Sequence, residues 1–375
     1  MNPQVEAALI AGIVSLISLG GTVIVAAVGF RTTRSVTRST LAEERVRTLN
    51  ERFATAADKL GSDKLPAVQL AGVYAMAGLA DDWSENRQTC VDVLCAYMRL
   101  PYASDPGDDA SAQEQLDFHA SREVRHTVIR VIAAHLREGA PISWQGLNFD
   151  FTGAVFDGGD FSGAEFSGGE VDFTYAKFSG RDLFQNDRHL VYKGYTDFTD
   201  AKFSGSTISF HGTEFSSGGV VFRGARFSGG MVRFFSLKIS GGTVDFGKAE
   251  FYGGYVGFIA AEFSGGDVRF IGAKFSGSEV DFDVDFSGST ISFYGTEFSG
   301  GTVDFTSAEF SGGTVDFSSA KFSGGTVDFS SAEFSGGTVD FSNTSDWSHP
   351  PEFEWHDRPP PAGVKLPAAT SEESQ

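Results

Sequence analysis

The sequence predicts a mainly β solenoid that is preceded by a transmembrane helix and a small helical module. Three observations lead to this prediction. Phenylalanine recurs at a fixed period in the C-terminal half, which holds most of the 37 Phe and 46 Gly residues. Residues 7–30 carry no charge and are numerous enough to cross a bilayer as a helix. Between these parts, residues 31–139 place apolar side chains at helical spacing.

The formal net charge is −20, from 49 acidic and 29 basic residues. Direct binding to a nucleic-acid backbone needs clustered Lys and Arg, so we expect no direct nucleic-acid partner. Two interpretations of the acidity remain open. It can keep a repeat array soluble, or it can make an acidic rod that imitates DNA.

The uncharged run favours an uncleaved membrane anchor over a signal peptide. A signal peptide needs a basic start and a shorter apolar stretch, whereas Glu6 is the only charged side chain before this run. Three arginines follow the span within residues 31–38, and no Lys or Arg precedes it. The positive-inside rule then places the tail of residues 1–6 outside and the bulk of the chain in the cytoplasm. We expect a single-pass cell-membrane protein that contacts lipid through residues 7–30.

One face of this predicted span consists of small residues at steps of three and four. Such a stripe lets two helices approach closely and suggests that the chain forms a homo-oligomer. Small residues are also common in transmembrane helices that do not associate. The residues of the stripe include Ala11, Ser15, Ser18 and Thr22.

Residues 31–139 are expected to form a juxtamembrane module of HEAT-like or helical-hairpin type. Gly61 and Pro101 end two of its helices, and Pro66 opens another. Residues 102–115 are rich in Asp, Ala, Ser and Gly, which predicts a loop. The expected helices span residues 40–60, a segment from Pro66 onward, 86–100 and 121–138.

No catalytic, cofactor-binding or metal-binding set stands out, so we expect a protein without enzyme activity or cofactor. Cys90 and Cys95 would point about 140° apart on a helix, which disfavours a local disulfide and indicates core thiols in a reducing compartment. The spacing of the histidines relative to these cysteines fits no zinc pattern. The histidines concerned are His119, His126 and His135.

The repeat is clearest in residues 303–341, which read VDFTSAEFSGGT, VDFSSAKFSGGT, VDFSSAEFSGGT and VDF. The period is twelve, the Phe residues alternate between steps of five and seven, and Val or Ala precedes each Phe by two positions. The repeat is one residue short between Asp283 and Phe286, and residues 179–197 interrupt it as an expected loop or irregular coil. The predicted core includes Phe156, Phe161, Phe166, Phe305, Phe310, Phe317, Phe322, Phe329, Phe334 and Phe341.

The segment NFDFTGAVFDGGDFSGAEFSG at residues 148–168 resembles the pentapeptide repeat family, whose unit is A-(D/N)-(L/F)-x-x. The central family residue matches Phe156, Phe161 and Phe166, and the small inward residue matches Ala154 and Ala164. This resemblance implies a right-handed quadrilateral β-helix over residues 148–346, with four faces per coil and the central side chain in the core. The stretch QLAGVYAMAGLADD…VDVLCAYMRLPY is similar to a module that precedes such repeats in bacterial membrane-anchored members.

The later repeats add two residues after every second pentapeptide, such as Gly313-Thr314. Faces of five, seven, five and seven residues would make a coil of 24, and residues 24 apart would stack at about 4.8 Å. Phe305 would then lie over Phe329, Phe317 over Phe341, Asp304 over Asp328, and Glu309 over Glu333. An alternative stays open, in which the longer steps are strands and the shorter steps are turns.

The end of the chain is expected to close the solenoid. Trp347, Phe353 and Trp355 follow the last repeat, so residues 347–357 are predicted to cap its open end. Residues 358–375 contain three successive prolines and a Ser/Glu tail, which predicts disorder.

These features favour a membrane-anchored, non-enzymatic interaction scaffold that presents the solenoid to an unidentified protein partner. The family resemblance supplies an alternative, because some soluble pentapeptide repeat proteins resemble DNA and inhibit DNA gyrase. The chain would then be a DNA-mimicking regulator of a DNA-binding enzyme such as gyrase. The anchor, the Lys and Arg residues of the middle repeats and the two-residue insertions count against this alternative.

Overall fold

The computed structural model describes residues 40–62, 65–102, 105–107, 109–179, 195–355 and 358–368. The chain divides into two compact units, Met1–Thr55 and Ala56–Gln375. In the first unit the described residues, 40–55, are helical. None of the described helices combines the length and the hydrophobicity that a bilayer crossing needs. The predicted span of residues 7–30, with Ala11, Ser15, Ser18 and Thr22, lies outside the described residues.

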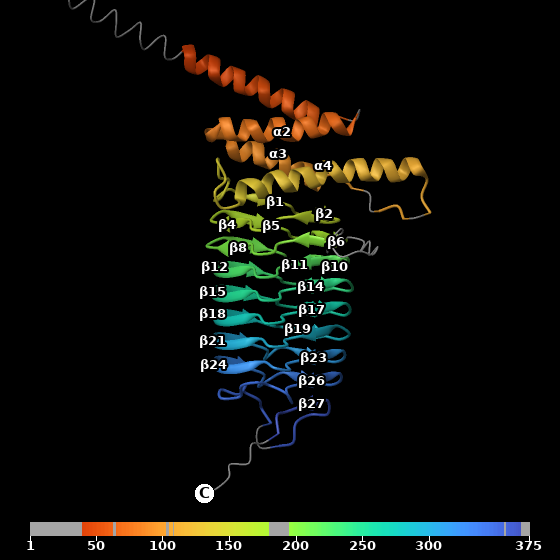
Figure 1. The fold of residues 1–375 in the computed structure, drawn as a ribbon, viewed down its shortest axis with the longest axis vertical. Helices are drawn as coiled ribbons and strands as arrows, with labels where there is room; N and C mark the ends of the chain where they lie inside the picture. The colour runs from red at the N-terminus through yellow and green to blue at the C-terminus, as the bar shows by residue number, and fades with distance from the viewer. Residues whose placement is uncertain are drawn as a thin grey trace, which may run out of the picture. The chain divides into compact units, whose positions relative to one another are not determined.

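The second unit opens with helices. Residues 56–60 are helical, and α2 (Pro66–Asp82), η1 (Ser84–Asn86), α3 (Arg87–Arg99) and α4 (Ala112–Leu136) follow (Figure 1). Pro66 occupies the first turn of α2, where a backbone N–H would lack a helical partner anyway. We call α2, α3 and α4 the helical module; α3 and α4 contact the first strands of the solenoid.

Helix α4 begins at Ala112 rather than at the expected Ser121, so the predicted loop is wrong for residues 112–115. The reason is a capping box. The Ser111 hydroxyl accepts the Glu114 N–H at 3.3 Å, and a Glu114 carboxylate oxygen accepts the Ser111 N–H at 2.9 Å. These two bonds satisfy backbone donors at the helix start and extend the helix beyond its apolar face.

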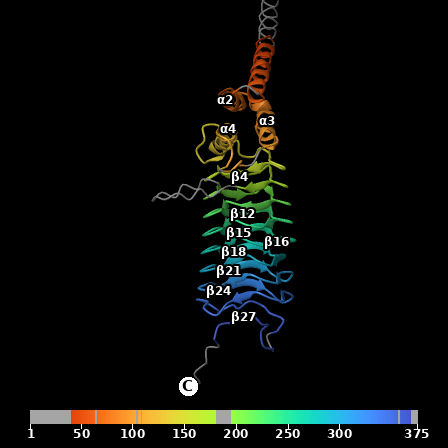
Figure 2. The same ribbon diagram turned by 90° about the vertical axis from the view of Figure 1, so that its right-hand side faces the viewer.

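Three sheets of parallel strands run along the solenoid (Figures 1 and 2). The first sheet contains β1 (Phe149–Asp150), β5 (Glu170–Asp172), β9 (Thr207–Ser209), β12 (Arg226–Arg233), β15 (Glu250–Gly257), β18 (Lys274–Asp281), β21 (Glu297–Asp304) and β24 (Lys321–Asp328), together with β4 (Glu165–Ser167) and β8 (Lys202–Ser204). The second contains β2 (Val155–Phe156), β6 (Lys177–Ser179), β10 (Glu214–Ser217), β13 (Lys238–Ile239), β16 (Ala261–Phe263), β19 (Val284–Phe286), β22 (Glu309–Phe310) and β25 (Glu333–Phe334). The third contains β3 (Gly159–Asp160), β7 (Tyr195–Asp197), β11 (Gly219–Val221), β14 (Thr243–Asp245), β17 (Asp267–Arg269), β20 (Thr290–Ser292), β23 (Thr314–Asp316), β26 (Thr338–Asp340) and β27 (Val364–Lys365). The predicted mainly β solenoid is therefore confirmed.

The strand register gives the length of a coil. Asp304 pairs with Asp328, and Glu309 pairs with Glu333, so equivalent residues are 24 apart as predicted. Where the repeat is one residue short, Ala261 pairs with Val284, and the coil takes 23 residues. The predicted stacking of like charges in this part of the solenoid is confirmed by the same register.

Each regular five-residue step begins with a turn and ends with two strand residues, such as Glu309–Phe310 of β22. The alternative, in which the longer steps are strands and the shorter steps are turns, is therefore confirmed only in part. Strand β21 covers most of the step from Phe298 to Phe305. In the turn that follows, the Ala308 N–H donates to the Phe305 carbonyl at 2.9 Å. The third residue of the equivalent turn in the next half-coil, Ser319, has a φ of 58°, which is the left-handed value that a type II turn requires there.

The Gly-Gly pair of the seven-residue step lets neighbouring coils approach. Gly325 has a φ of 71°, and a Cβ at this position would lie 2.7 Å from the Gly301 carbonyl oxygen. A side chain would therefore be strained by its backbone conformation and would also collide with the coil before it. This explains why the pair recurs wherever the repeat is regular.

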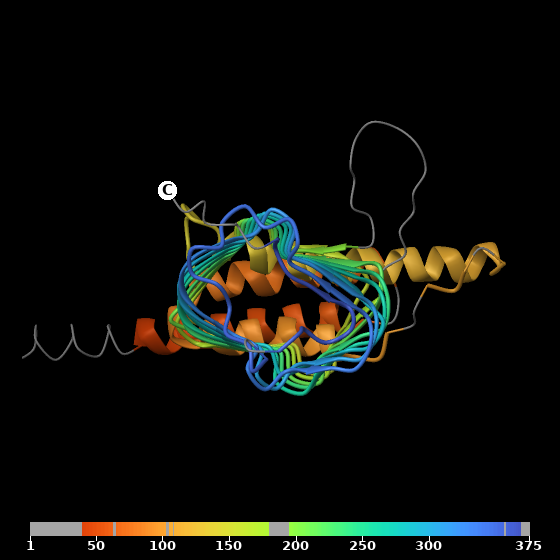
Figure 3. The same cartoon turned by 90° about the horizontal axis from the view of Figure 1, so that it is seen from below.

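Phenylalanine rings fill the solenoid in columns, and successive coils superpose in outline when seen from below (Figure 3). Phe305 stacks on Phe329 with ring centroids 4.4 Å apart, and Phe317 stacks on Phe341 at 4.5 Å. Nine of the ten phenylalanines predicted in the core are buried, namely Phe156, Phe161, Phe166, Phe305, Phe310, Phe317, Phe322, Phe329 and Phe341. The tenth, Phe334, is only partly buried because it lies in the last coil.

Aromatic side chains cover the C-terminal end of the solenoid. The rings of Trp347, Phe353 and Trp355 contact those of Phe322, Phe329 and Phe334, with centroid distances of 5.2, 5.5 and 4.8 Å. The chain then returns as β27, which pairs with β26. The expected disorder of residues 358–375 is therefore wrong for Val364–Lys365. Val364 is 8% exposed and extends the third sheet, although prolines dominate its neighbourhood.

The expected irregular segment of residues 179–197 is ordered at both ends. Ser179 is the last residue of β6, and Tyr195–Asp197 forms β7. That part of the prediction is wrong, because these ends pair with the next coil: Ser179 pairs with Ser217, and Thr196 pairs with Val220. Residues 180–194 lie outside the described part of the chain.

Candidate functional site

A buried carboxylate joins the helical module to the first coil. Asp157 is 7% exposed and lies just before β3. Its oxygens accept hydrogen bonds from Tyr102 Oη at 2.7 Å and Arg122 Nε at 2.9 Å, and His126 Nε2 lies 3.0 Å away. Arg122 also donates to the Asp157 carbonyl at 3.0 Å. Two side chains of α4 and one from the segment after α3 therefore converge on one residue of the solenoid.

Arg125 makes a second link beside this carboxylate. It is 3% exposed, and its Nη2 donates to the carbonyls of Met98 at 2.7 Å and Val155 at 2.8 Å. Its guanidinium lies 4.4 Å from the centre of the Tyr102 ring, which is a cation–π distance. We call Tyr102, Arg122, Arg125, His126 and Asp157 the clamp.

The environment fixes the charge of the clamp. Burial raises the pKa of the Asp157 carboxyl, but hydrogen bonds from His126 and Tyr102 and the neighbouring guanidinium lower it by more, so its pKa lies below the ordinary value. Burial, and then the charge of Asp157, raises the pKa of Tyr102. At neutral pH the carboxylate is ionised and the phenol is protonated. The resulting contacts all hold backbone segments together, which is a structural role rather than a chemical one.

The histidines and cysteines singled out in the sequence do not assemble into a metal site. His126 Nε2 lies 3.0 Å from an Asp157 oxygen, and His135 Nε2 lies 3.2 Å from an oxygen of Asp81 in α2. Cys90 and Cys95 are both buried, and neither forms a disulfide. Within the described ranges, no group of three His, Cys, Asp or Glu side chains is placed to hold a metal ion.

The outer surface of the solenoid is divided by charge. Residues 195–279 contain eight acids and eight bases, whereas residues 280–355 contain thirteen acids and one base, Lys321. We call these stretches the neutral half and the acidic half. In the neutral half, opposite charges meet between coils, as in Arg226–Glu250 at 3.3 Å and Lys238–Glu262 at 3.5 Å. In the acidic half, carboxylates stack on carboxylates, with the Lys321–Glu297 pair at 2.9 Å as an exception.

The repeated Asp before Phe also has a local role that the sequence analysis missed. Asp304 Oδ1 accepts the Thr306 N–H at 2.7 Å, and Asp316 Oδ1 accepts the Ser318 N–H at 2.8 Å. An Asp side chain that bonds to the backbone two residues on stabilises a turn. The pattern Asp-Phe-Ser/Thr in each repeat was the signal that could have revealed this role.

Asp281 lies where the neutral half meets the acidic half, and its surroundings disfavour ionisation. Burial, and then the charges of Asp304 and Asp283, raises its pKa. An acid whose pKa is raised by folding stabilises the protein below its unfolded pKa of about 3.9 and loses that contribution as pH rises through the folded pKa.

We therefore expect Asp281→Asn to raise stability at pH 7 by roughly 0.5 kcal/mol, the scale of a screened charge pair near the surface. Urea unfolding at pH 7 and at pH 4 checks this, and the gain should shrink at pH 4 and in high salt. Glu262→Gln, which removes a carboxylate paired with Lys238, is the matched control and should give no gain. A loss of stability for Asp281→Asn would contradict the electrostatic explanation.

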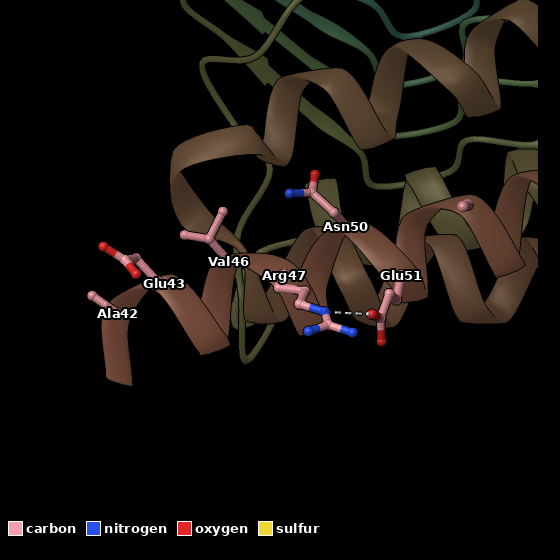
Figure 4. Close-up of a pocket in the computed structure, with 7 residues that line it drawn as sticks. Ala42, Glu43, Val46, Arg47, Asn50 and Glu51 are labelled. Carbon is pink, nitrogen blue, oxygen red and sulfur yellow. Dashed lines mark hydrogen bonds and ion pairs between the residues drawn. The ribbon is translucent and has the colours of Figure 1, made fainter. Parts of the chain in front are cut away.

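Two hollows in the described surface differ in whether their walls can surround a ligand. A hollow of about 650 Å³ lies along the first-unit helix, where Arg47 Nε and Glu51 Oε1 are 3.0 Å apart (Figure 4). All of its lining residues, 42–54, belong to one helix, so they cannot surround a ligand. A groove of about 750 Å³ lies on the first sheet between Glu170 and Tyr255, and it draws its walls from four coils.

Comparison with known proteins bears on the solenoid. A family model described as Pentapeptide repeats (9 copies) matches residues 193–236. No curated protein and no solved structure matches the chain. The match supports the pentapeptide-repeat prediction on a part of the solenoid different from residues 148–168, which carry the resemblance.

Proposed function

We propose that this chain is a membrane-anchored, non-enzymatic scaffold whose solenoid binds a protein partner. The observation that carries this proposal is the division of the outer surface by charge. Both halves have the same coil and the same core, so folding does not require thirteen acids against one base in residues 280–355. A surface of one sign on a rigid column attracts a partner of the opposite sign and orients it. The partner would accordingly present a basic surface.

The finer description of the fold belongs to this proposal. Each regular coil has four extended segments, for example the two parts of β21 on either side of its register shift, then β22 and β23. This supports the quadrilateral β-helix that the family resemblance implies. A right-handed winding is part of the same proposal.

The anchor is proposed from the sequence of residues 7–30. The uncharged run and the arginines that follow it support a single membrane crossing with the solenoid in the cytoplasm. Alkaline extraction of membranes tests this: the full chain should stay in the membrane pellet, and a variant without residues 1–39 should be released. A C-terminal tag that is digested by protease in intact cells would contradict the proposed orientation.

Capture of partners from membranes tests the scaffold. We expect Glu309→Lys with Glu333→Lys to lower partner recovery by roughly tenfold, because it reverses the charge of two stacked, exposed residues in the acidic half. The matched control is Glu214→Lys with Glu262→Lys on the same sheet in the neutral half, which should retain the partner. Equal loss in both variants, or recovery that does not depend on salt, would contradict the proposal.

The acidic half also favours the second candidate, a DNA-mimicking regulator of an enzyme such as gyrase. A supercoiling assay with the detergent-solubilised full chain separates the two functions. Inhibition at micromolar concentration that disappears in Glu309→Lys with Glu333→Lys would favour the regulator. Uninhibited supercoiling would remove this candidate and leave the scaffold.

A further inference from the structure

The groove on the first sheet arises because three successive coils depart from the regular repeat. In a regular coil the outward positions on this face carry Thr302, Asp304 and Thr306. Four successive coils line the groove in register with these positions. The coil of β5 carries Glu170, Asp172 and Thr174, and the coil of β9 carries Thr207, Ser209 and His211. The coil of β12 carries Met231, Arg233 and Phe235, and the coil of β15 carries Tyr255, Gly257 and Ile259. A coil with the small hydroxyl side chains of Thr207 and Ser209, followed by His211, therefore lies between an acidic wall and a bulky wall. This difference in side-chain size creates the groove.

The aromatic rings of Phe235 and Tyr255 form part of the bulky wall. A Cβ placed on Gly257 would lie 2.5 Å from Tyr255 Oη and 2.6 Å from the Phe235 ring. Both rings therefore extend over a position where the regular repeat has Asp. The Tyr255 hydroxyl donates to Asp281 at 3.4 Å, which helps to hold its ring in place. The absence of a side chain at Gly257 thus leaves room for an apolar surface beside the groove.

Arg233 is the charged group of the same wall. It is partly buried, and its Nε donates to the Met231 sulfur at 2.8 Å. Among the described residues it forms no ion pair, unlike Arg269, which pairs with Asp267 at 2.7 Å. A guanidinium that lines the same groove as two aromatic rings, and that pairs with no acid in the described part of the chain, is suited to bind a carboxylate from a ligand.

The opposite wall accepts hydrogen bonds. Glu170 is exposed, and Asp172 uses one carboxylate oxygen to accept the Thr174 N–H at 2.8 Å. In the intermediate coil the Thr207 hydroxyl adds a further acceptor, whereas Ser209 Oγ already accepts the His211 N–H at 3.3 Å and lies 2.8 Å from Thr174 Oγ1. The groove is therefore polarised, with acceptors on one wall and a guanidinium on the other. Its volume of about 750 Å³ is within the range of sites that bind organic ligands, which is far more than an ion needs.

We propose that this groove binds the carboxyl terminus of a partner protein that ends in an aromatic or large aliphatic residue. The terminal carboxylate bonds to Arg233, the last side chain packs on Phe235 and Tyr255, and upstream N–H groups or a basic side chain bond to Glu170 and Asp172. Charge complementarity supports this occupant. The carboxylate at the end of an extended chain is an acceptor and faces the wall with Arg233, whereas the N–H groups before it are donors and face the wall with Glu170 and Asp172. The proposal rests on the interaction function proposed above and defines the chemistry of one partner.

Binding of labelled peptides to the detergent-solubilised full chain tests the proposal. The probe is a hexapeptide that ends in Lys-Ser-Leu-Phe, prepared with a free carboxylate and as the terminal amide. We expect the free acid to bind about tenfold or more tightly than the amide, as for the loss of a charge-assisted hydrogen bond. Arg233→Gln should abolish this difference, whereas the matched control Arg269→Gln should keep it.

A second variant separates a folding defect from a binding defect. Gly257→Asp restores the residue of the regular repeat, so the fold should be retained while the displaced rings and the added charge weaken peptide binding about tenfold. Equal binding of acid and amide, no binding of either peptide at millimolar concentration, or unchanged binding by Arg233→Gln would overturn the proposal. N-acetylphenylalanine that competes as well as the peptide would also overturn it, in favour of a small carboxylate ligand. Salt-sensitive capture of a partner through Glu309 and Glu333 would survive all these outcomes, so the scaffold can stand if this groove fails.

Discussion

Replacing Phe317 with alanine is expected to destabilise the solenoid by roughly 3–5 kcal/mol, because it opens a cavity in a close-packed column. The Phe317 side chain is fully buried, and its ring stacks on Phe293 at 4.7 Å and on Phe341 at 4.5 Å. Neither neighbour can move into the space without leaving the ring beyond it. Urea unfolding followed by circular dichroism measures the loss.

The matched control is Phe334→Ala in the last coil. Phe334 is partly exposed, so its removal should cost less than the removal of Phe317. A loss below about 1 kcal/mol for Phe317→Ala would mean that the ring contributes no more than a surface side chain. That result would contradict the stacked core.

Asp157→Asn is expected to destabilise the junction between the helical module and the solenoid by roughly 3–5 kcal/mol at pH 7. The substitution removes one charge from a buried network and leaves Arg122 with fewer acceptors, and breaking such a network costs more than the net value of the ion pair. The exposed counterpart is Asp160→Asn, whose side chain is 59% exposed, and its charge contributes about 1 kcal/mol or less. Hydrogen exchange should show faster opening of α4 in Asp157→Asn only.

The same residue predicts a pH dependence. Folding lowers the pKa of Asp157, so its contribution is fully present above the unfolded pKa of about 3.9 and is lost as pH falls through the folded pKa. The stability difference between the wild-type chain and Asp157→Asn should therefore be largest at neutral pH and should disappear in acid. A difference that stays constant from pH 7 to pH 3 would show that the charge is not responsible.

The coil length was predictable from the period of the repeat. A solenoid buries its core only when equivalent side chains stack, so a period of twelve with two kinds of step limits the coil to a multiple of twelve. The distinction between strands and turns was not fixed by the period, because Phe ends both kinds of step. In the structure a five-residue step begins with a turn, in which Ser319 exemplifies the left-handed third residue, and ends with strand residues, as in β22.

The clamp could not be predicted, because its parts lie far apart in the chain and carry no local signal. Arg122 and Asp157 are separated by 35 residues, and neither belongs to a recognisable motif. The start of α4 could have been predicted, because Ser111 and Glu114 have the spacing of a capping box. Strand β27 was hidden by the prolines around Val364, whose pairing depends on the completed third sheet.

The groove could be predicted from the sequence only in part. Met231, Arg233 and Phe235 differ from the Thr, Asp and Ser/Thr of the regular repeat, and that difference is visible in the sequence. Their position beside Thr207 and Ser209 follows only once the coil is known to contain 24 residues. Departures from a repeat consensus become informative when the register places them in columns.

Disulfide formation between engineered cysteines tests the 24-residue coil most directly. Thr302 and Thr326 are exposed register partners in adjacent parallel strands, whose Cα atoms lie about 4.8 Å apart, within the range that a disulfide spans. Mild oxidation of Thr302→Cys with Thr326→Cys should give a cross-linked peptide in mass spectrometry. Thr302→Cys with Thr314→Cys, half a coil apart on different sheets, should stay reduced. A disulfide in the second pair and none in the first would contradict the stacked coils.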